Sequence, residues 1–219
     1  MKSCKLQIGL TLVEMLIVVA VITLLASMVI GIAARLDSQS KERLAENTFA
    51  LLNAALGQFQ DFGYNYMDDY YRDFEFPIDC NSLTRPDLEN ELGKALDMPG
   101  EISITPTGAA YDPNYSGSAA LYFFLSQVPA SRQTLDKIDG SLITNENSDR
   151  DELEIEVGER RYPLQRVIDP WGETLRYSYY ENPHENTKEP DFDEPRNFPI
   201  ITSAGPDRIF GTDDDMTNR

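Results

Sequence analysis

Histidine and cysteine are nearly absent from this chain, which narrows the chemistry open to it. Its 219 residues include a single histidine, His184, and two cysteines, Cys4 and Cys80. A Ser–His–Asp triad needs a histidine beside its nucleophile, and structural zinc sites need four Cys or His ligands. His184 stands in a polar stretch of Asn, Pro and Glu. We therefore expect neither an enzyme of these classes nor a disulfide framework.

Basic residues are also scarce. Nineteen Lys and Arg residues face 37 Asp and Glu residues, which gives a formal net charge of −18. Binding to nucleic acid needs clustered Lys and Arg, so nucleic acid is not an expected partner. The chain has no glycine-rich loop with a lysine that would hold nucleotide phosphates. The acidic residues gather after Asp61, which predicts an anionic, well-solvated body.

One segment has no charge at all. No charged side chain stands between Met15 and Ala34. A helix of about 20 residues is about 30 Å long, which matches the hydrocarbon core of a bilayer. Lys2 and Lys5 precede this segment, and mostly acidic residues follow it. The sequence predicts a single membrane-spanning helix whose N-terminus faces the cytoplasm.

Glu14 lies at the edge of the apolar segment, where a carboxylate is costly unless it is paired or near the interface. Residues 1–9 form a short polar leader that ends in Gly9. If the chain is cleaved after Gly9, the Glu14 carboxylate can pair with the α-amino group of Leu10 in a neighbouring subunit. The alternative is that Glu14 only marks the headgroup boundary.

The helix is expected to continue beyond the apolar segment. Apolar or small side chains recur at steps of three and four residues, which is the period of an amphipathic helix. They are Leu44, Thr48, Leu52, Ala55, Leu56 and Phe59. We predict one helix over residues 11–62, stopped by Gly63. Residues 10–35 would be its assembly half, 36–62 its amphipathic half, and 63–219 a globular head.

The head is expected to combine short helices and strands. The patterns predict helices over 83–96 and over 118–128, the second capped by Ser118 and ended by Pro129, with a polar loop over 133–150. Alternation predicts strands over 101–105, 152–157, 175–180 and 198–202. The segment Asp169-Pro170-Trp171-Gly172 reads as a turn. The fold class is therefore α+β, with a long N-terminal helix packed on a small antiparallel sheet.

The end of the sequence is rich in aspartate and glycine. Asp207, Asp213 and Asp215 stand close together, and Gly205 and Gly211 let the loop fold back. Carboxylate and carbonyl oxygens on a flexible loop suit Ca²⁺. Acidic tails are also often simply solvated, so the residues alone leave both interpretations open.

Two motifs carry a family resemblance. The run Gly9-Leu10-Thr11-Leu12-Val13-Glu14-Met15-Leu16 resembles the class III signal of type IV pilins and type II secretion pseudopilins. The resemblance implies that a prepilin peptidase cuts after Gly9, that the new N-terminal residue Leu10 is methylated, and that Glu14 supports assembly. Leu10 departs from the phenylalanine usual at that position.

The second motif is Asp169-Pro170-Trp171-Gly172, a tyrosine-rich strand, and then Ser203-x-Gly205-x-Asp207. It resembles the major pseudopilins of type II secretion systems, in which Ca²⁺ pins the C-terminal loop of the head. The sequence departs from that pattern at Arg208, where glycine is usual, and in a longer region over 64–165. The resemblance implies ligands from Asp207 and Asp215, a further one from Asp213, and carbonyls from Ile201 or Ser203.

The resemblance implies a structural subunit of a type II secretion pseudopilus. It would be anchored in the inner membrane with a periplasmic head. Its partners would be other copies of itself, minor pseudopilins, an inner-membrane assembly platform and the prepilin peptidase. A type IV pilus subunit is the alternative, although surface pilins often close a C-terminal loop with two cysteines, which this head lacks. The remaining alternative is a membrane-anchored metal-dependent hydrolase.

We predict that mass spectrometry of the mature protein finds a methylated Leu10 at its N-terminus, because cleavage after Gly9 exposes that residue. Cells without a prepilin peptidase are the control, and there the chain should keep Met1. A chain that starts at Met1 in cells containing the peptidase would contradict the prediction.

Overall fold

The computed structural model describes residues 12–65, 82–105, 111–147, 149–178 and 199–218, without the side chains of 28–35, 63–65 and 178. The chain divides into two compact units, Met1–Glu42 and Arg43–Arg219. Each unit is described by itself.

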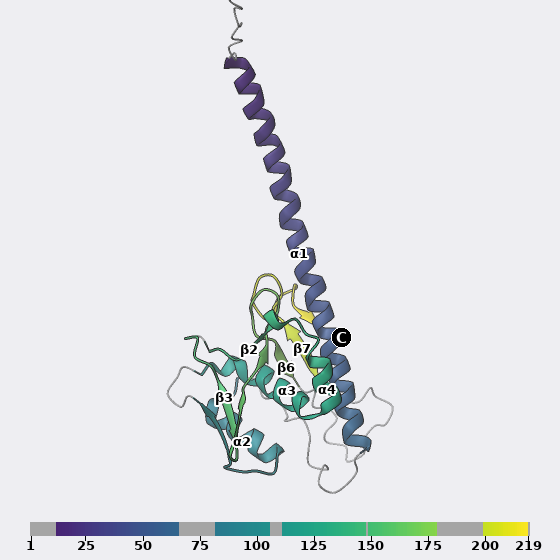
Figure 1. The fold of residues 1–219 in the computed structure, drawn as a ribbon, viewed down its shortest axis with the longest axis vertical. Helices are drawn as coiled ribbons and strands as arrows, with labels where there is room; N and C mark the ends of the chain where they lie inside the picture. The colour runs from purple at the N-terminus through teal and green to yellow at the C-terminus, as the bar shows by residue number, and fades with distance from the viewer. Residues whose placement is uncertain (1–11, 66–81, 106–110, 148, 179–198, 219) are drawn as a thin grey trace, which may run out of the picture. The chain divides into compact units, whose positions relative to one another are not determined.

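Helix α1 (Leu12–Asn65) is a single helix of 54 residues, drawn in purple to blue in Figure 1. The long helix predicted over 11–62 is confirmed. The predicted stop at Gly63 is wrong, since α1 ends at Asn65. A glycine costs a helix only about 1 kcal/mol relative to alanine, so it does not end one by itself.

In the first unit, α1 has exposed side chains over residues 12–27. Within the part of the chain that the structure describes, no helix combines the length and the hydropathy of a membrane span. The span predicted between Met15 and Ala34 continues into residues 28–34, whose side chains lie outside the described residues.

In the second unit, α1 buries one face in the hydrophobic core of the head. The predicted stripe is confirmed, because its members face the core at helical spacing. Leu52, Ala55, Leu56 and Phe59 are at most 5% exposed, and Leu44 is partly buried against the core. Phe49, which the prediction did not include, is buried on the same face. The hydroxyl of Thr48, also on this face, donates to the carbonyl of Leu44 at 2.8 Å, so a polar side chain is tolerated there.

Helix α2 (Arg85–Ala95) has Pro86 in its first turn and buries Leu88 and Leu92. It lies near a three-stranded antiparallel sheet of β1 (Ile102–Thr105), β3 (Glu154–Val157) and β4 (Arg160–Pro163), in the order β1-β3-β4. The helix predicted over 83–96 and the first two strands are confirmed. Ile104 pairs with Ile155, and both are fully buried, so this face of the sheet packs on the core.

Helix α3 (Ser116–Gln127) follows the short helix η2 (Pro113–Tyr115). The prediction that Ser118 caps α3 is wrong. Ser118 lies inside the helix, buried, and its hydroxyl donates to the Val167 carbonyl at 3.1 Å and accepts from the Val167 N–H at 3.0 Å. This long-range bond replaces the local one that a cap would make.

The polar loop predicted over 133–150 is also wrong in part. Helix α4 (Pro129–Leu135), the short helix η3 (Gly140–Leu142) and β2 (Ile143–Thr144) occupy this stretch. Leu135, Ile138 and Leu142 are at most 5% exposed. Three buried side chains among many polar ones are enough to dock the segment, which composition alone does not reveal.

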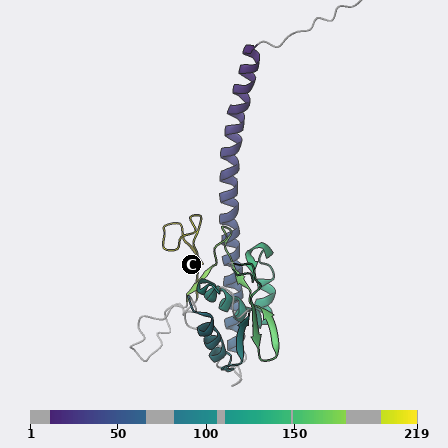
Figure 2. The same cartoon turned by 90° about the vertical axis from the view of Figure 1, so that its left-hand side faces the viewer.

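Two further small antiparallel sheets complete the described strands. One pairs β2 with β5 (Arg166–Val167), and the other has the order β6 (Arg176–Ser178), β7 (Ile200–Ser203), β8 (Met216–Thr217). The strands predicted over 175–180 and 198–202 are confirmed in the residues described. The fold is α+β, with an N-terminal helix and small antiparallel sheets (Figure 2).

We predict that Leu56→Ala and Gly57→Ala, two neighbours on α1, change stability in opposite directions. Leu56 is fully buried, so its truncation should cost about 2–5 kcal/mol. A methyl group at Gly57 meets no atom within 4 Å, and alanine should stabilise the helix by about 0.5–1 kcal/mol.

The free energy of unfolding can be followed by denaturant titration of the fluorescence of Trp171, the only tryptophan. Trp171 is 7% exposed, so unfolding should change its emission. A stability loss at Gly57→Ala equal to that at Leu56→Ala would contradict the packing described.

Candidate functional site

Residues 204–215, here named the Asp loop, join β7 to β8. The loop closes through Gly205, whose φ is +66°. A Cβ atom there would lie 2.2 Å from the carbonyl oxygen of Asp214. Only glycine permits this close approach of two backbone segments, which explains the glycine of the Ser203-x-Gly205-x-Asp207 motif.

Asp214 organises the loop from inside. One of its carboxylate oxygens accepts a hydrogen bond from the Asp207 N–H at 3.0 Å, and the other accepts from the Thr212 hydroxyl at 2.6 Å. The Thr212 hydroxyl is the largest cause, and the Asp207 N–H the second, that lower the pKa of Asp214 below its ordinary value. The sequence did not single out Asp214, because local sequence alone does not distinguish the three consecutive aspartates Asp213, Asp214 and Asp215.

Asp207 and Asp215 also accept hydrogen bonds from backbone amides. Asp207 accepts one from the Ile209 N–H at 2.8 Å, and Asp215 Oδ2 accepts one from the Gly211 N–H at 2.7 Å. The other oxygen, Asp215 Oδ1, is shielded from solvent and accepts no hydrogen bond from the described residues. A shielded carboxylate oxygen without a donor is destabilising on its own and would be satisfied by a cation.

Asp169 fastens the entrance of the loop. Its Oδ1 accepts hydrogen bonds from the backbone N–H groups of Trp171 and Glu173 at 3.0 and 2.9 Å. Its Oδ2 accepts from the hydroxyl of Ser203 at 2.7 Å, and Ser203 Oγ in turn accepts from the Gly205 N–H at 3.1 Å. The predicted turn is confirmed, since Gly172 has a φ of +97°. The buried Asp169 of this turn connects the turn to β7 through its hydrogen bond with Ser203.

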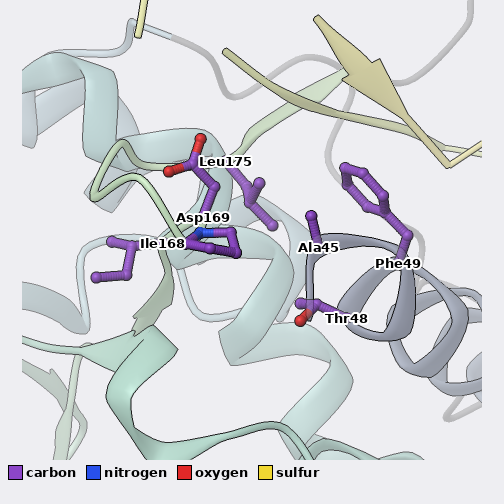
Figure 3. A pocket seen from close by; sticks show the side chains of 7 residues that line it. Ala45, Thr48, Phe49, Ile168, Asp169 and Leu175 are labelled. Carbon is purple, nitrogen blue, oxygen red and sulfur yellow. The ribbon is translucent and has the colours of Figure 1, made fainter. Parts of the chain in front are cut away.

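A shallow apolar notch lies beside this turn. Figure 3 shows Ala45, Thr48 and Phe49 on α1 across from Ile168 and Leu175. The notch is too narrow to admit a water molecule, so it is a packing feature and not a ligand pocket.

The structure places the predicted ligand residues in and next to the Asp loop without gathering them. Within the described ranges, no three His, Cys, Asp or Glu side chains come together as a metal-binding group. Asp213 is exposed. The Ile201 carbonyl accepts a hydrogen bond from the Asn218 N–H at 3.2 Å, and Ser203 is held by Asp169. Calcium binding stays a prediction.

The N-terminal site residues are less completely described. Gly9 and Leu10 lie outside the described residues, as do Cys80 and His184. Glu14 lies in the first turn of α1 and is exposed.

Comparisons with protein-family models, curated proteins and solved structures found no significant match to the chain. A function for this chain must therefore be argued from its own residues.

We predict that Thr212→Val raises the pKa of Asp214 towards its ordinary value, because the hydroxyl that stabilises the carboxylate is lost. A carbon-detected NMR titration of the carboxyl group measures this shift. Since the pKa is lowered in the folded state, the contribution of Asp214 to stability is present above its ordinary value of 3.8 and is lost as pH falls through the lowered value.

Thr212→Ser keeps the hydroxyl and is the matched control, in which the pKa of Asp214 should stay low. An Asp214 pKa that is the same in both variants would show that the Thr212 hydroxyl does not stabilise the carboxylate.

Proposed function

We propose that this chain is a structural subunit of a type II secretion pseudopilus, which α1 anchors in the inner membrane and then assembles into a periplasmic filament. The observation that carries the proposal is the exposed apolar surface of α1. Among the described residues from Leu12 to Leu25, eleven large apolar side chains are 49–81% exposed. They lie on every side of the helix, so burial against one partner face would leave the others in water.

An apolar surface on every side of a helix is stable only where other apolar groups cover it on every side. A bilayer does so for a single subunit, and neighbouring apolar helices do so in a filament. The eleven side chains are Leu12, Val13, Met15, Leu16, Ile17, Val18, Val19, Val21, Ile22, Leu24 and Leu25.

The polar groups of this segment support the same proposal. The hydroxyl of Thr23 donates to the Ala20 carbonyl at 2.9 Å, and that of Ser27 donates to the Leu24 carbonyl at 2.8 Å. Hydroxyls bonded within their own helix add little cost in an environment without water. Charged side chains return after the apolar segment, and among them Lys41 lies 3.2 Å from Asp37. This change marks the proposed exit from the membrane.

Glu14 then has a function in assembly. After cleavage behind Gly9, the first residue is Leu10, and its α-amino group carries a positive charge near neutral pH. An acid at residue 14 of one subunit would attract that amino group of its neighbour where little water screens the pair. The pair would favour one axial offset between subunits, since the attraction weakens as the two charges move apart.

The proposal extends to Ca²⁺ at the Asp loop. Its support is the shielded Asp215 Oδ1, together with the carboxylates of Asp207 and Asp213 on the same loop. Some side-chain oxygens of the loop accept hydrogen bonds from backbone N–H groups. They would have to reorient to complete a coordination shell of six to eight oxygens. The ion would neutralise part of the negative charge of the Asp loop.

A deletion strain distinguishes the pseudopilus from a surface pilus. Under the proposal, loss of this gene product stops the export of secreted proteins across the outer membrane and leaves twitching motility and DNA uptake intact. The reverse pattern would assign the chain to a type IV pilus.

We predict that Glu14→Val and Glu14→Gln leave the subunit in the membrane fraction but reduce filament assembly at least about tenfold, because the loss of one buried ion-pair partner costs several kcal/mol. Sheared filaments can be quantified by immunoblotting. Asp37→Asn, which removes a carboxylate of α1 outside the apolar segment, is the control and should assemble. Normal filaments from both Glu14 variants would refute the pairing.

We predict that Ca²⁺ raises the melting temperature of the protein and that Asp207→Ala with Asp215→Ala abolishes the increase, since binding to the folded state alone stabilises it. Differential scanning fluorimetry in Ca²⁺ and in chelator measures the shift. Asp149→Ala, an exposed aspartate in a distant segment, controls for general charge effects. An identical melt of the wild type in Ca²⁺ and in chelator would end the calcium proposal.

A further inference from the structure

Asn53 of α1 is hydrogen-bonded directly to Asn218, the last residue that the structure describes. The Asn53 Nδ2 group donates to the Asn218 carbonyl at 2.9 Å, and the Asn218 Nδ2 group donates to Asn53 Oδ1 at 2.6 Å. The two residues therefore bond reciprocally, the Asn53 amide to the backbone and side chain of Asn218, over a separation of 165 residues.

Asn218 also holds the strand beside it. Its Oδ1 accepts from the Ile201 N–H at 2.9 Å, its Nδ2 donates to the Pro199 carbonyl at 3.1 Å, and its backbone N–H donates to the Ile201 carbonyl at 3.2 Å. With the described residues, Asn218 thus makes five hydrogen bonds. Strand β8 has only two residues, paired at Thr202–Thr217 and Ser203–Met216, so these bonds are a large share of what fixes it.

We propose that Asn53 and Asn218 form a latch that sets the position of the Asp loop. The loop is tied at its entrance by the bond between Asp169 and Ser203, and it leaves directly into β8. Fixing β8 to α1 fixes the exit. A closed loop lowers the entropy lost when its carboxylates are ordered around a ligand. Through this latch, α1 and the loop influence each other.

This inference rests on the proposed function only where calcium is concerned. If Ca²⁺ binds the loop more tightly with the latch closed, then Ca²⁺ also favours the closed latch to the same degree. Occupancy of the loop would then stabilise the attachment of β8 to the helix that assembles the filament.

Hydrogen exchange of the full-length chain in detergent micelles, without calcium, tests the latch itself. The backbone amides of Asp207, Ile209 and Gly211 are hydrogen-bonded within the loop, so they report its order. Asn53→Ala removes two of the hydrogen bonds made by Asn53 and Asn218, and Asn218→Ala removes three of them, so each variant should speed exchange of the three amides at least about tenfold.

Two variants separate the latch from simple packing. Gln58→Ala removes another amide of α1, which accepts a hydrogen bond from the Thr134 hydroxyl at 2.8 Å, and should leave the three loop amides unchanged. Asn218→Asp keeps the size of the side chain but turns the donor that faces Asn53 and Pro199 into an acceptor. It should be at least as disruptive as alanine. Wild-type exchange in Asn218→Asp would overturn the latch.

A titration with CaCl₂, followed by calorimetry on the same samples, tests the coupling. The latch variants should bind Ca²⁺ about tenfold more weakly than the wild type, and Gln58→Ala should bind normally. Faster loop exchange with unchanged calcium affinity would overturn the coupling. Faster loop exchange in a protein whose wild type binds no Ca²⁺ would support the latch and overturn the calcium proposal instead.

Discussion

The exposed apolar surface of α1 is the constraint on which the other features depend. Between Leu12 and Leu25 the helix presents large apolar side chains on all sides, and its own chain supplies nothing in the described residues that covers them. The free energy of exposing such groups to water is about 25 cal/mol for each Å², so an unpartnered segment of this kind is unstable in solution. The head must therefore remain well solvated, and its net negative charge serves that need.

The same helix solves the burial problem in two different ways. From Phe49 to Phe59 its apolar side chains lie on one face and enter the core of the head. Here the partner surface comes from the same polypeptide, while the side chains of residues 12–27 are exposed. A change from an all-round to a one-sided distribution of apolar residues thus divides α1 into a part with apolar side chains on every side and a part that packs on the core of the head, within one continuous backbone.

The periodic parts of the fold could be predicted from the sequence, and the parts that depend on distant contacts could not. The stripe on α1 and the alternation in β3 are local patterns, so the sequence revealed them. Ser118 was predicted wrongly because its partner, Val167, is 49 residues away. In the site, the glycines and the cluster of aspartates were visible. The organising role of Asp214 depends on a loop closure that spacing does not encode. The role of Asn218 could not be predicted, since a single asparagine forms no recognisable sequence pattern.

Strand β4 bears on how the protein behaves at high concentration. In the part of the chain that is described, β4 pairs with β3 alone, and its residues are all exposed. An open strand edge invites unwanted pairing with the same edge of a neighbour. Arg160 and Arg161 would repel their counterparts there, and Pro163 has no N–H to offer. The edge is thereby protected from aggregation, so high local concentration need not join the heads into a continuous sheet.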